Sequence, residues 1–260
     1  MPFRLDDRVA LVTGSGSPDG IGFAAARLLA AMGARVAVTS TTERCHERAT
    51  ELTAHGAEAI AELADLTDPE QAERLVTQVT DAWGRIDILV NNAGMTSVSD
   101  PDSGGAFLDL PPEHWAHSIE RNLGTAITVT RLVLAGMLAR GAGRIVNVAS
   151  TSGPVGAYPD DAAYHAAKAG MVGVTRALAV EVAARGITVN AVCPGWIATP
   201  SVSEDEHRMG LASPMRRSGR PNEVAASIGF LASDEASYVN GELLVVDGGN
   251  AVTEDRRLPT

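Results

Sequence analysis

Short apolar runs alternate along the chain with stretches in which apolar residues recur at helical spacing. The stretch after the first run is typical of an amphipathic helix, because its apolar residues at 21, 24, 25, 28, 29 and 32 fall on one face. Strands that alternate with helices predict an α/β fold, a doubly wound parallel sheet of the Rossmann type in three α/β/α layers. The apolar runs are RVALV (8–12), RVAVT (35–39), IDILV (86–90), GRIVNVA (143–149), ITVNAV (187–192) and ELLVVD (242–247).

This alternation continues from residue 9 to residue 247 with no Pro/Gly/Ser-rich linker and no internal repeat. We therefore expect residues 1–260 to form a single domain, with strands buried on both faces. Two polar, turn-rich stretches interrupt the pattern, at about 96–112 and 198–214. Each follows a strand, where open α/β sheets place their binding crevice. They are predicted substrate loops, with ordinary mobile surface loops as the alternative.

Composition narrows the classes of partner. A hydrophobic share of 45% with 20% charged residues is ordinary for a globular protein, and the net charge of -11 argues against a nucleic-acid partner. No segment reads as a membrane span or secretory signal, so we expect no membrane partner and a cytoplasmic protein. Cys45 and Cys193 lie in unrelated contexts and are expected to be reduced thiols. The six histidines are scattered, and no metal site is predicted.

A glycine-rich turn, TGSGSPDGIG, follows the first apolar run and leads into the amphipathic stretch. Glycines here let the backbone turn tightly and approach a pyrophosphate, which would sit on the positive end of the helix. The order of strand, glycine turn and helix predicts a dinucleotide site in the first β/α unit. The residues assigned to this site are Gly14, Gly16, Asp19, Gly20, Ile21 and Gly22.

The end of the second apolar run bears on the choice of dinucleotide. An NAD site usually carries an acid there to hold the ribose 2'-hydroxyl, whereas this chain has Ser40 and Thr41, with Arg44 nearby. Hydroxyls and an arginine accept a 2'-phosphate without the repulsion of a carboxylate, so NADP(H) is favoured. Asp19 argues the other way if it faces the same phosphate, which leaves NAD(H) open.

The stretch AAYHAAKAG sets a phenol and an ammonium one helical turn apart among very small residues. The spacing of Tyr164 and Lys168 places both on one face of a helix. A carbonyl that receives hydride develops negative charge on its oxygen and needs a proton donor there. A phenol beside an ammonium meets this need, since the positive charge is expected to lower the pKa of the phenol.

Taken together, these features resemble the short-chain dehydrogenase/reductase family in its compact form, which is similar to 3-oxoacyl-carrier-protein reductases and related ketoreductases. The resemblance covers nearly the whole chain. It rests on the glycine turn, NNAG (91–94), Asn122 in RNLGT, Ser150 in IVNVAST, YHAAK (164–168), PGWIAT (194–199) and VVDGG (245–249).

The resemblance implies an NADP(H)-dependent oxidoreductase that interconverts a ketone and a secondary alcohol, and a homotetramer. In it Tyr164 is the general acid/base, Ser150 hydrogen-bonds the carbonyl oxygen and Lys168 also binds the nicotinamide ribose. Asn122 holds a water of the proton relay, unless its side chain only kinks or caps a helix. The other implied cofactor residues are Asp65 and Leu66, then Asn92, Ala93 and Gly94, then Pro194, Gly195, Ile197 and Thr199. For Asp65, in DLTDPE, a helix-capping role is the alternative.

One departure from the family pattern lies in the glycine turn, where five residues separate Gly14 from Gly20 instead of three. Contacts around the adenosine phosphate are therefore expected to differ. The enoyl-carrier-protein reductase branch is disfavoured, because it places six residues between tyrosine and lysine. A nucleotide-sugar epimerase is disfavoured too, since only about ninety residues follow Lys168. An NAD-dependent alcohol dehydrogenase of the same family and a catalytically silent dinucleotide-binding sensor stay open. The sequence does not identify the substrate either, although Trp196 could line the binding site of an apolar substrate.

Overall fold

A seven-stranded sheet, parallel throughout, forms the centre of the computed structural model, which describes residues 3–94 and 104–254. The strand order is β3-β2-β1-β4-β5-β6-β7, so the chain builds outward from β1 on one side and then crosses to β4 on the other. The predicted doubly wound sheet of the Rossmann type is therefore confirmed. The strands are β1 (Val9–Val12), β2 (Arg35–Ser40), β3 (Ala59–Leu63), β4 (Ile88–Asn91), β5 (Gly143–Val148), β6 (Ile187–Pro194) and β7 (Leu243–Val246).

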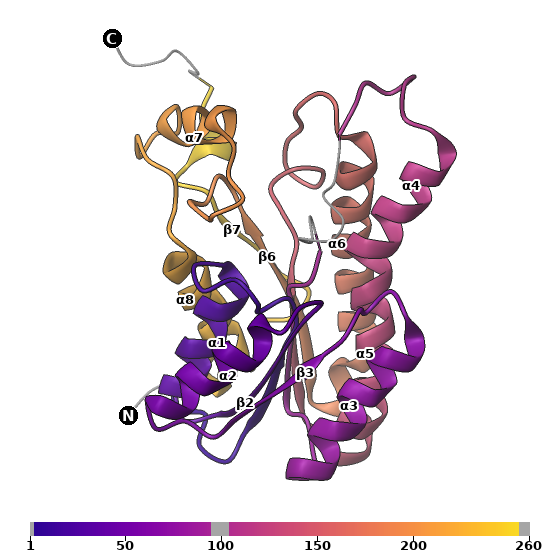
Figure 1. Cartoon of the computed structure of the whole chain (residues 1–260), viewed down its shortest axis with the longest axis vertical. Helices are drawn as coiled ribbons and strands as arrows, with labels where there is room; N and C mark the ends of the chain where they lie inside the picture. The colour runs from indigo at the N-terminus through magenta and orange to yellow at the C-terminus, as the bar shows by residue number, and fades with distance from the viewer. Residues whose placement is uncertain (1–2, 95–103, 255–260) are drawn as a thin grey trace.

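Helices cover both faces of this sheet and make the three layers visible in Figure 1. One face carries α1 (Ile21–Ala31), α2 (Arg44–Ala54) and α8 (Pro221–Ala232). The other carries α3 (Pro69–Trp83), α4 (Pro112–Ile119), α5 (Thr125–Arg140) and α6 (Ala162–Val182). A further helix, α7 (Glu204–Leu211), lies at the top of Figure 1 near the upper ends of β6 and β7. Short 3₁₀ segments occupy Ala183–Arg185, Asp234–Ala236 and Asn250–Val252.

The hydrophobic core is split between the two faces of the sheet. Residues of β1 alternate between them: Ala10 and Val12 pack with α1 and α8, whereas Val9 and Leu11 pack with α3 and α5. All four are fully buried. The near-continuous apolar sequence of β1 thus follows from its place at the centre of a sheet that is covered on both sides.

The two outer strands depart from the expectation that every strand is buried on both faces. All four residues of β7 are partly exposed, and β3 has one buried residue, Ala61. Both strands pair on one side only. Because an edge strand is less enclosed, β3 tolerates the polar Glu62, and its sequence lacks a continuous apolar run.

The longest apolar helical run comprises α4, a π-helical turn at Glu120–Gly124 and α5. The run has 29 residues and includes an 18-residue stretch with a mean hydropathy of 1.4, so by length and composition it could cross a membrane. This corrects the expectation that no segment of the chain could do so. The run contacts α3, α6, β4 and β5. These contacts are those of a helix that covers a sheet in a globular core. Length and apolar composition alone do not distinguish such a helix from one that spans a membrane.

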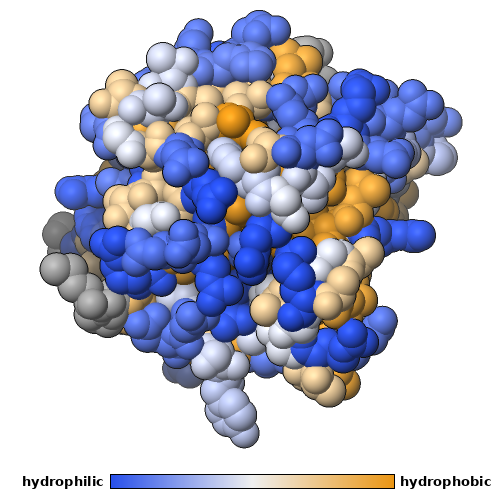
Figure 2. Space-filling model, turned by 90° about the horizontal axis from the view of Figure 1, so that it is seen from below, coloured by the Kyte–Doolittle hydropathy of each residue, from blue (hydrophilic) through white to orange (hydrophobic). Residues whose placement is uncertain are grey.

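The end of the molecule opposite α7 is seen in Figure 2, where hydrophilic residues cover most of the surface. Hydrophobic residues gather toward the side on which Figure 1 draws α3 and α5. Both cysteines, Cys45 and Cys193, are buried free thiols, as expected. Among the described residues no group of three or more His, Cys, Asp or Glu side chains is arranged to hold a metal ion.

Candidate active site

The carboxyl ends of the parallel strands bring the predicted site residues to one edge of the sheet. Gly14 follows β1, Asn92 follows β4, Ser150 follows β5, and Pro194 ends β6. Segments far apart in sequence therefore meet because the strands run side by side. Open α/β sheets bind their ligands at this edge, where the strand order reverses.

Close backbone packing explains two of the glycines in the turn after β1. Gly14 has a φ of +67°, and a Cβ there would lie 2.8 Å from the Cα of Ala93. A Cβ on Gly22 would lie 2.6 Å from the carbonyl oxygen of Gly14 and 2.5 Å from Nδ2 of Asn92. Only glycine fits at these two positions, so the turn presses its backbone directly against the segment after β4.

Thr13 fixes this contact and is a residue that the sequence interpretation missed. Its hydroxyl oxygen accepts hydrogen bonds from the backbone N–H of Asn92 at 2.9 Å and of Ala93 at 3.0 Å. In return, Nδ2 of Asn92 donates to the carbonyl oxygens of Thr13 and Gly14, both at 3.0 Å. A buried threonine directly after a strand resembles any other core position in the sequence, so no signal marked it.

The amino end of α1 suits a pyrophosphate. Its N-cap residue is Gly20, with no side-chain cap hydrogen bond, and the first turn of the helix contains no acidic residue. The positive end of the helix dipole and its first N–H groups are thus left to an anion. Asp19 is exposed just before this turn. The described residues therefore fit the dinucleotide that the glycine turn predicts.

At the end of β2 the side chains are tied to one another. The Ser40 hydroxyl donates to the carbonyl oxygen of Thr42 at 2.6 Å, and Nε of Arg44 donates to the Thr42 hydroxyl at 3.1 Å. A Cβ on Gly16 would lie 2.8 Å from the Ser40 hydroxyl oxygen, so the glycine turn touches this group. Thr41 is exposed beside it. The structure thus joins the predicted phosphate-binding turn to the residues predicted to select the cofactor.

The cap of α3 resolves the alternative raised for Asp65. Asp68 is the N-cap residue, and its carboxylate accepts from the backbone N–H of Glu70 at 2.9 Å. Asp65 instead accepts from the backbone N–H and the hydroxyl of Thr67. Asp65 therefore does not cap the helix, and its side chain is exposed, whereas the side chain of Leu66 is buried in the core. Any contact of Leu66 with a cofactor would therefore come from its backbone.

Ser150, Tyr164 and Lys168 converge where β5 ends and α6 begins. All three side chains are buried. The Ser150 hydroxyl oxygen accepts from the backbone N–H of Ser152 at 3.0 Å, and the Ser150 side chain is near enough to Tyr164 to act on the pKa of its phenol. The Lys168 ammonium donates to the carbonyl oxygen of Val148 at 3.1 Å and lies 5.7 Å from the centroid of the Tyr164 ring. Strand and helix thus position one hydroxyl, one phenol and one ammonium together.

Burial dominates the electrostatics of this group. Burial raises the pKa of Tyr164 to about 12, although the nearby Ser150 side chain acts to lower it. Burial also lowers the pKa of Lys168 to about 8. The prediction that Lys168 lowers the pKa of Tyr164 is therefore wrong for the protein without cofactor, because burial disfavours the charged form of both side chains. The same effect raises the pKa of the Cys193 thiol to about 12.

Asn122 lies in the π-helical turn between α4 and α5 and is fully buried. Its amide Nδ2 donates to the carbonyl oxygen of Ser118 at 3.1 Å, so the side chain does bond within the distorted helix. A Cβ on Gly94 would lie 2.8 Å from Oδ1 of Asn122 and 3.5 Å from Nζ of Lys168. The side chains of Asn122 and Lys168 therefore both lie close to Gly94, just after the end of β4. Such π-bulges are frequent at functional sites.

The segment after β6 is anchored on both sides. The backbone N–H of Gly195 donates to the carbonyl oxygen of Val246 at 3.0 Å, and a Cβ on Gly195 would lie 2.7 Å from that of Asp247. Ile197 is buried, and the next N–H, of Ala198, donates to the carbonyl oxygen of Gly219 at 2.8 Å. Thr199 hydrogen-bonds Ser201 through its side chain. The predicted cofactor residues from Pro194 to Thr199 therefore form one braced turn beside Ser150.

The two predicted substrate loops have different outcomes. Residues 95–103 lie outside the described part of the chain, so 96–112 is described from Gly104 onward, where Phe107 and Leu108 are exposed. The stretch 198–214 is not a loop throughout, because it contains α7. The Ser203 hydroxyl accepts from the backbone N–H of Glu206, and the Glu206 carboxylate accepts from the backbone N–H of Ser203. These two bonds form a capping box, which was not predicted from this acidic stretch.

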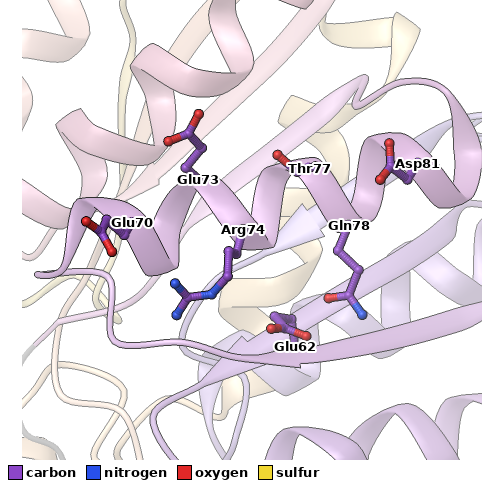
Figure 3. A pocket seen from close by; sticks show the side chains of 7 residues that line it. All are labelled: Glu62, Glu70, Glu73, Arg74, Thr77, Gln78 and Asp81. Atoms are coloured by element: carbon purple, nitrogen blue, oxygen red, sulfur yellow. The ribbon is translucent and has the colours of Figure 1, made fainter.

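A separate open hollow of about 650 Å³ lies on α3 and the neighbouring strand β3 (Figure 3). Six of its side chains come from α3 and one, Glu62, from β3. None is a predicted catalytic or cofactor residue. Its lining is Glu62, Glu70, Glu73, Arg74, Thr77, Gln78 and Asp81.

This fold and site define an oxidoreductase of the short-chain dehydrogenase/reductase family, to which the chain belongs. A family model described as "Enoyl-(Acyl carrier protein) reductase" matches residues 14–251. Members of the family interconvert CH–OH and C=O groups with NAD(P)(H) as cofactor. This chain is an enzyme of that kind.

Particular relatives match along almost the entire chain. The 3-oxoacyl-[acyl-carrier-protein] reductase FabG of Vibrio cholerae is 40% identical over 95% of this chain and 98% of its own length. The oxidoreductase UcpA of Escherichia coli is 39% identical over 96% of this chain and 97% of its own length. The crystal structure of levodione reductase superposes with a TM-score of 0.89 at 34% identity, covering 96% of this chain and 100% of that one.

Proposed function

We propose that the protein is an NADP(H)-dependent ketoreductase that interconverts a ketone and a secondary alcohol. The observation that carries this proposal is the convergence of Ser150, Tyr164 and Lys168, all buried, where β5 ends and α6 begins. A reaction that moves a proton to an oxygen needs a donor held beside a hydrogen-bonding hydroxyl. The family supplies the reaction class, and these side chains supply the proton chemistry.

In the proposed mechanism a dinucleotide held by the glycine turn and by the segment from Pro194 to Thr199 would supply the hydride that reduces the carbonyl carbon. Ser150 donates a hydrogen bond to the carbonyl oxygen, and Tyr164 gives its phenol proton to that oxygen as negative charge develops on it. Lys168 stabilises the resulting phenolate, whose proton is then replaced by way of Lys168 and a water held at Asn122. In the reverse direction the phenolate takes the alcohol proton, so the same groups serve oxidation.

Preference for NADP(H) is part of the proposal. It is supported by the hydroxyl-rich end of β2, where Arg44 is held beside Thr42 and Ser40 contacts the glycine turn. The described residues from 39 to 42 contain no carboxylate that would repel a 2'-phosphate. We also propose a cytoplasmic location, which both buried free thiols suit.

A homotetramer is proposed on the basis of the exposed face of α6. This face is rich in small residues, and Val180 on it is 82% exposed. The partly exposed β7 offers a second surface. A sedimentation mass near four times 27.0 kDa would support the tetramer, and a monomeric mass would exclude it.

The experiment that tests the function is a titration of the protein with NADPH and with NADH, followed by nicotinamide fluorescence and then by loss of absorbance with a panel of ketones. We expect tighter NADPH binding and turnover of at least one ketone. Arg44→Ala should weaken NADPH binding roughly tenfold and leave NADH binding unchanged. Binding without any turnover would favour the silent sensor, and tighter NADH binding would favour the NAD-dependent dehydrogenase.

A further inference from the structure

A second tyrosine, Tyr158, lies close to the catalytic group and has no role in the mechanism above. It precedes α6 and is partly buried. Its hydroxyl donates to Oδ2 of Asp161 at 2.9 Å, and its backbone N–H donates to Nε2 of His165 at 3.1 Å. Its ring lies 4.5 Å from that of His165 and 5.9 Å from that of Trp196, measured between centroids. Four contacts thus fix both its backbone and its ring.

The His165 ring connects Tyr158 to α6 through two hydrogen bonds. Because Nε2 accepts a hydrogen bond from Tyr158, the proton of the neutral imidazole must lie on Nδ1. Nδ1 lies 2.6 Å from the carbonyl oxygen of Asp161 and donates to it. The loop that carries Tyr158 is therefore tied to the first turn of α6, the same turn that holds Tyr164.

Tyr158 also connects the two sides of the reacting centre. His165, which contacts its ring, lies 6.2 Å from the Tyr164 ring between centroids. Trp196, which also contacts its ring, belongs to the braced turn after β6 that contains the predicted cofactor residues from Pro194 to Thr199. An aromatic wall defined by Tyr158 and Trp196 therefore runs from the proton donor to the cofactor segment. Flat aromatic faces contribute apolar contact with little loss of side-chain freedom.

The charged group in contact with Tyr158 is a carboxylate, because its hydroxyl donates to Asp161, whereas the Lys168 ammonium lies beside Tyr164. Burial is the main cause that raises the pKa values of Tyr158 and Tyr164, and the carboxylates of Asp161 and Glu206 act in the same direction. Arg208, a cation of α7, is paired with Glu204 and Asp205. A substrate bound here would meet aromatic surface and carboxylates, and a second negative charge would be repelled.

We propose that Tyr158, together with Trp196, determines substrate specificity, and that the enzyme takes uncharged, ring-bearing ketones in preference to open-chain or anionic ones. This inference rests on the proposed ketoreductase function and names its substrate class. Tyr158 acts by contact with the substrate body, whereas His165 is a positioning residue that holds Tyr158 in place.

The test compares three probes of nine carbons with NADPH: 1-indanone, which is flat and cyclic, 2-nonanone, which is open-chain, and 8-oxononanoate, which is anionic. In the parent enzyme we expect kcat/KM for 1-indanone to exceed that for either other probe by roughly tenfold. Tyr158→Leu should lower the value for 1-indanone roughly tenfold, mainly through KM, and change that for 2-nonanone by less than about threefold.

Two variants serve as controls. Tyr158→Phe keeps the ring and should retain the preference for 1-indanone. Tyr238→Leu removes a fully exposed tyrosine and should leave all three values unchanged. His165→Phe should raise KM for 1-indanone while kcat falls by less than about threefold, since only the position of Tyr158 is disturbed.

The specificity proposal is overturned if Tyr158→Leu lowers all three values equally, or if the parent prefers the open-chain or anionic probe. Failure of the ketoreductase function has a different signature. It would appear as binding of 1-indanone to the NADP⁺ complex without turnover of any probe, and loss of that binding in Tyr158→Leu would still support the wall. A parent that binds NADPH but neither binds nor reduces 1-indanone excludes the proposal.

Discussion

The cofactor half and the catalytic half of the site are built in different ways. The cofactor half, around Gly14, Gly22 and Asn92, is made of backbone packed against backbone, where an added Cβ has no room. The catalytic half, around Tyr164 and Lys168, is made of side chains whose charged states are opposed by burial. Shape therefore governs the first half and electrostatics governs the second. Each half can be broken by a substitution that leaves the other intact.

The largest effect is expected in the catalytic half, from Tyr164→Phe. Only the transferable proton is removed, so kcat should fall by about 10²–10⁴-fold while NADPH binding is largely retained. Steady-state kinetics and a fluorescence titration measure the two quantities. Tyr238→Phe, at a fully exposed site, is the matched control and should behave as the parent does. Turnover by Tyr164→Phe at the parental rate would remove Tyr164 from the mechanism.

The backbone-built half is broken by Gly14→Ala. The new methyl group would lie 2.8 Å from the Ala93 backbone at a residue with positive φ, so the turn must shift. We expect NADPH to bind roughly 100-fold more weakly and the protein to be destabilised by about 1–3 kcal/mol. Gly56→Ala is the control, because Gly56 has a φ of +87° but no atom near the added Cβ. It should cost stability alone, and equal losses of binding in both variants would contradict the packing argument.

The smallest effect sharpens the electrostatic side of the comparison. Burial of the charged Lys168 disfavours the folded state, so in the protein without cofactor Lys168→Met should raise the free energy of unfolding. The shift of its pKa to about 8 corresponds to about 3 kcal/mol below pH 8, from which loss of the bond to Val148 subtracts about 1 kcal/mol. Thermal unfolding followed across pH measures the difference.

The pH dependence gives the sign of this effect. Between pH 8 and about 10.5 the unfolded parent keeps the Lys168 proton that the folded parent has lost, so parental stability rises with pH there. The advantage of Lys168→Met is therefore greatest below pH 8 and shrinks above it. Arg176→Met, at an exposed position of α6, is the control and should show no such trend. A constant difference from pH 7 to 10.5 would show that Lys168 is not buried as a charged group.

The same comparison explains how much the sequence could predict. Glycine spacing records backbone geometry, and hydrophobic spacing records the type of element, so the glycine turn and the alternation of strands and helices were predictable from local pattern alone. Tyr164 and Lys168 were predictable because their spacing on one helix is local too. Six of the strands differ from the predicted runs by a residue or two at their ends, as with β6, which extends to Pro194, whereas the edge strand β3 was not among those runs.

Features that depend on distant contacts were not predictable. Thr13 binds the segment after β4, and Tyr158 acquires its role from Trp196 in another turn. The pKa of Tyr164 was predicted in the wrong direction, because sequence shows a neighbouring charge but not the depth of burial. The helix α7 was missed because its acidic first turn looks like a solvated loop, although that charge suits the amino end of a helix.

The strand order has a consequence for synthesis of the chain. Ala10 of β1 pairs with Val36 on one side, which is made soon afterward, but with Ile88 on the other. While the ribosome produces the residues between, β1 has one edge of unpaired, fully apolar strand, which is the kind of edge that pairs with other chains. Completion of β4 is therefore the step that ends the exposure of the future sheet centre. Slow translation before residue 88 would prolong the interval in which nascent chains can aggregate.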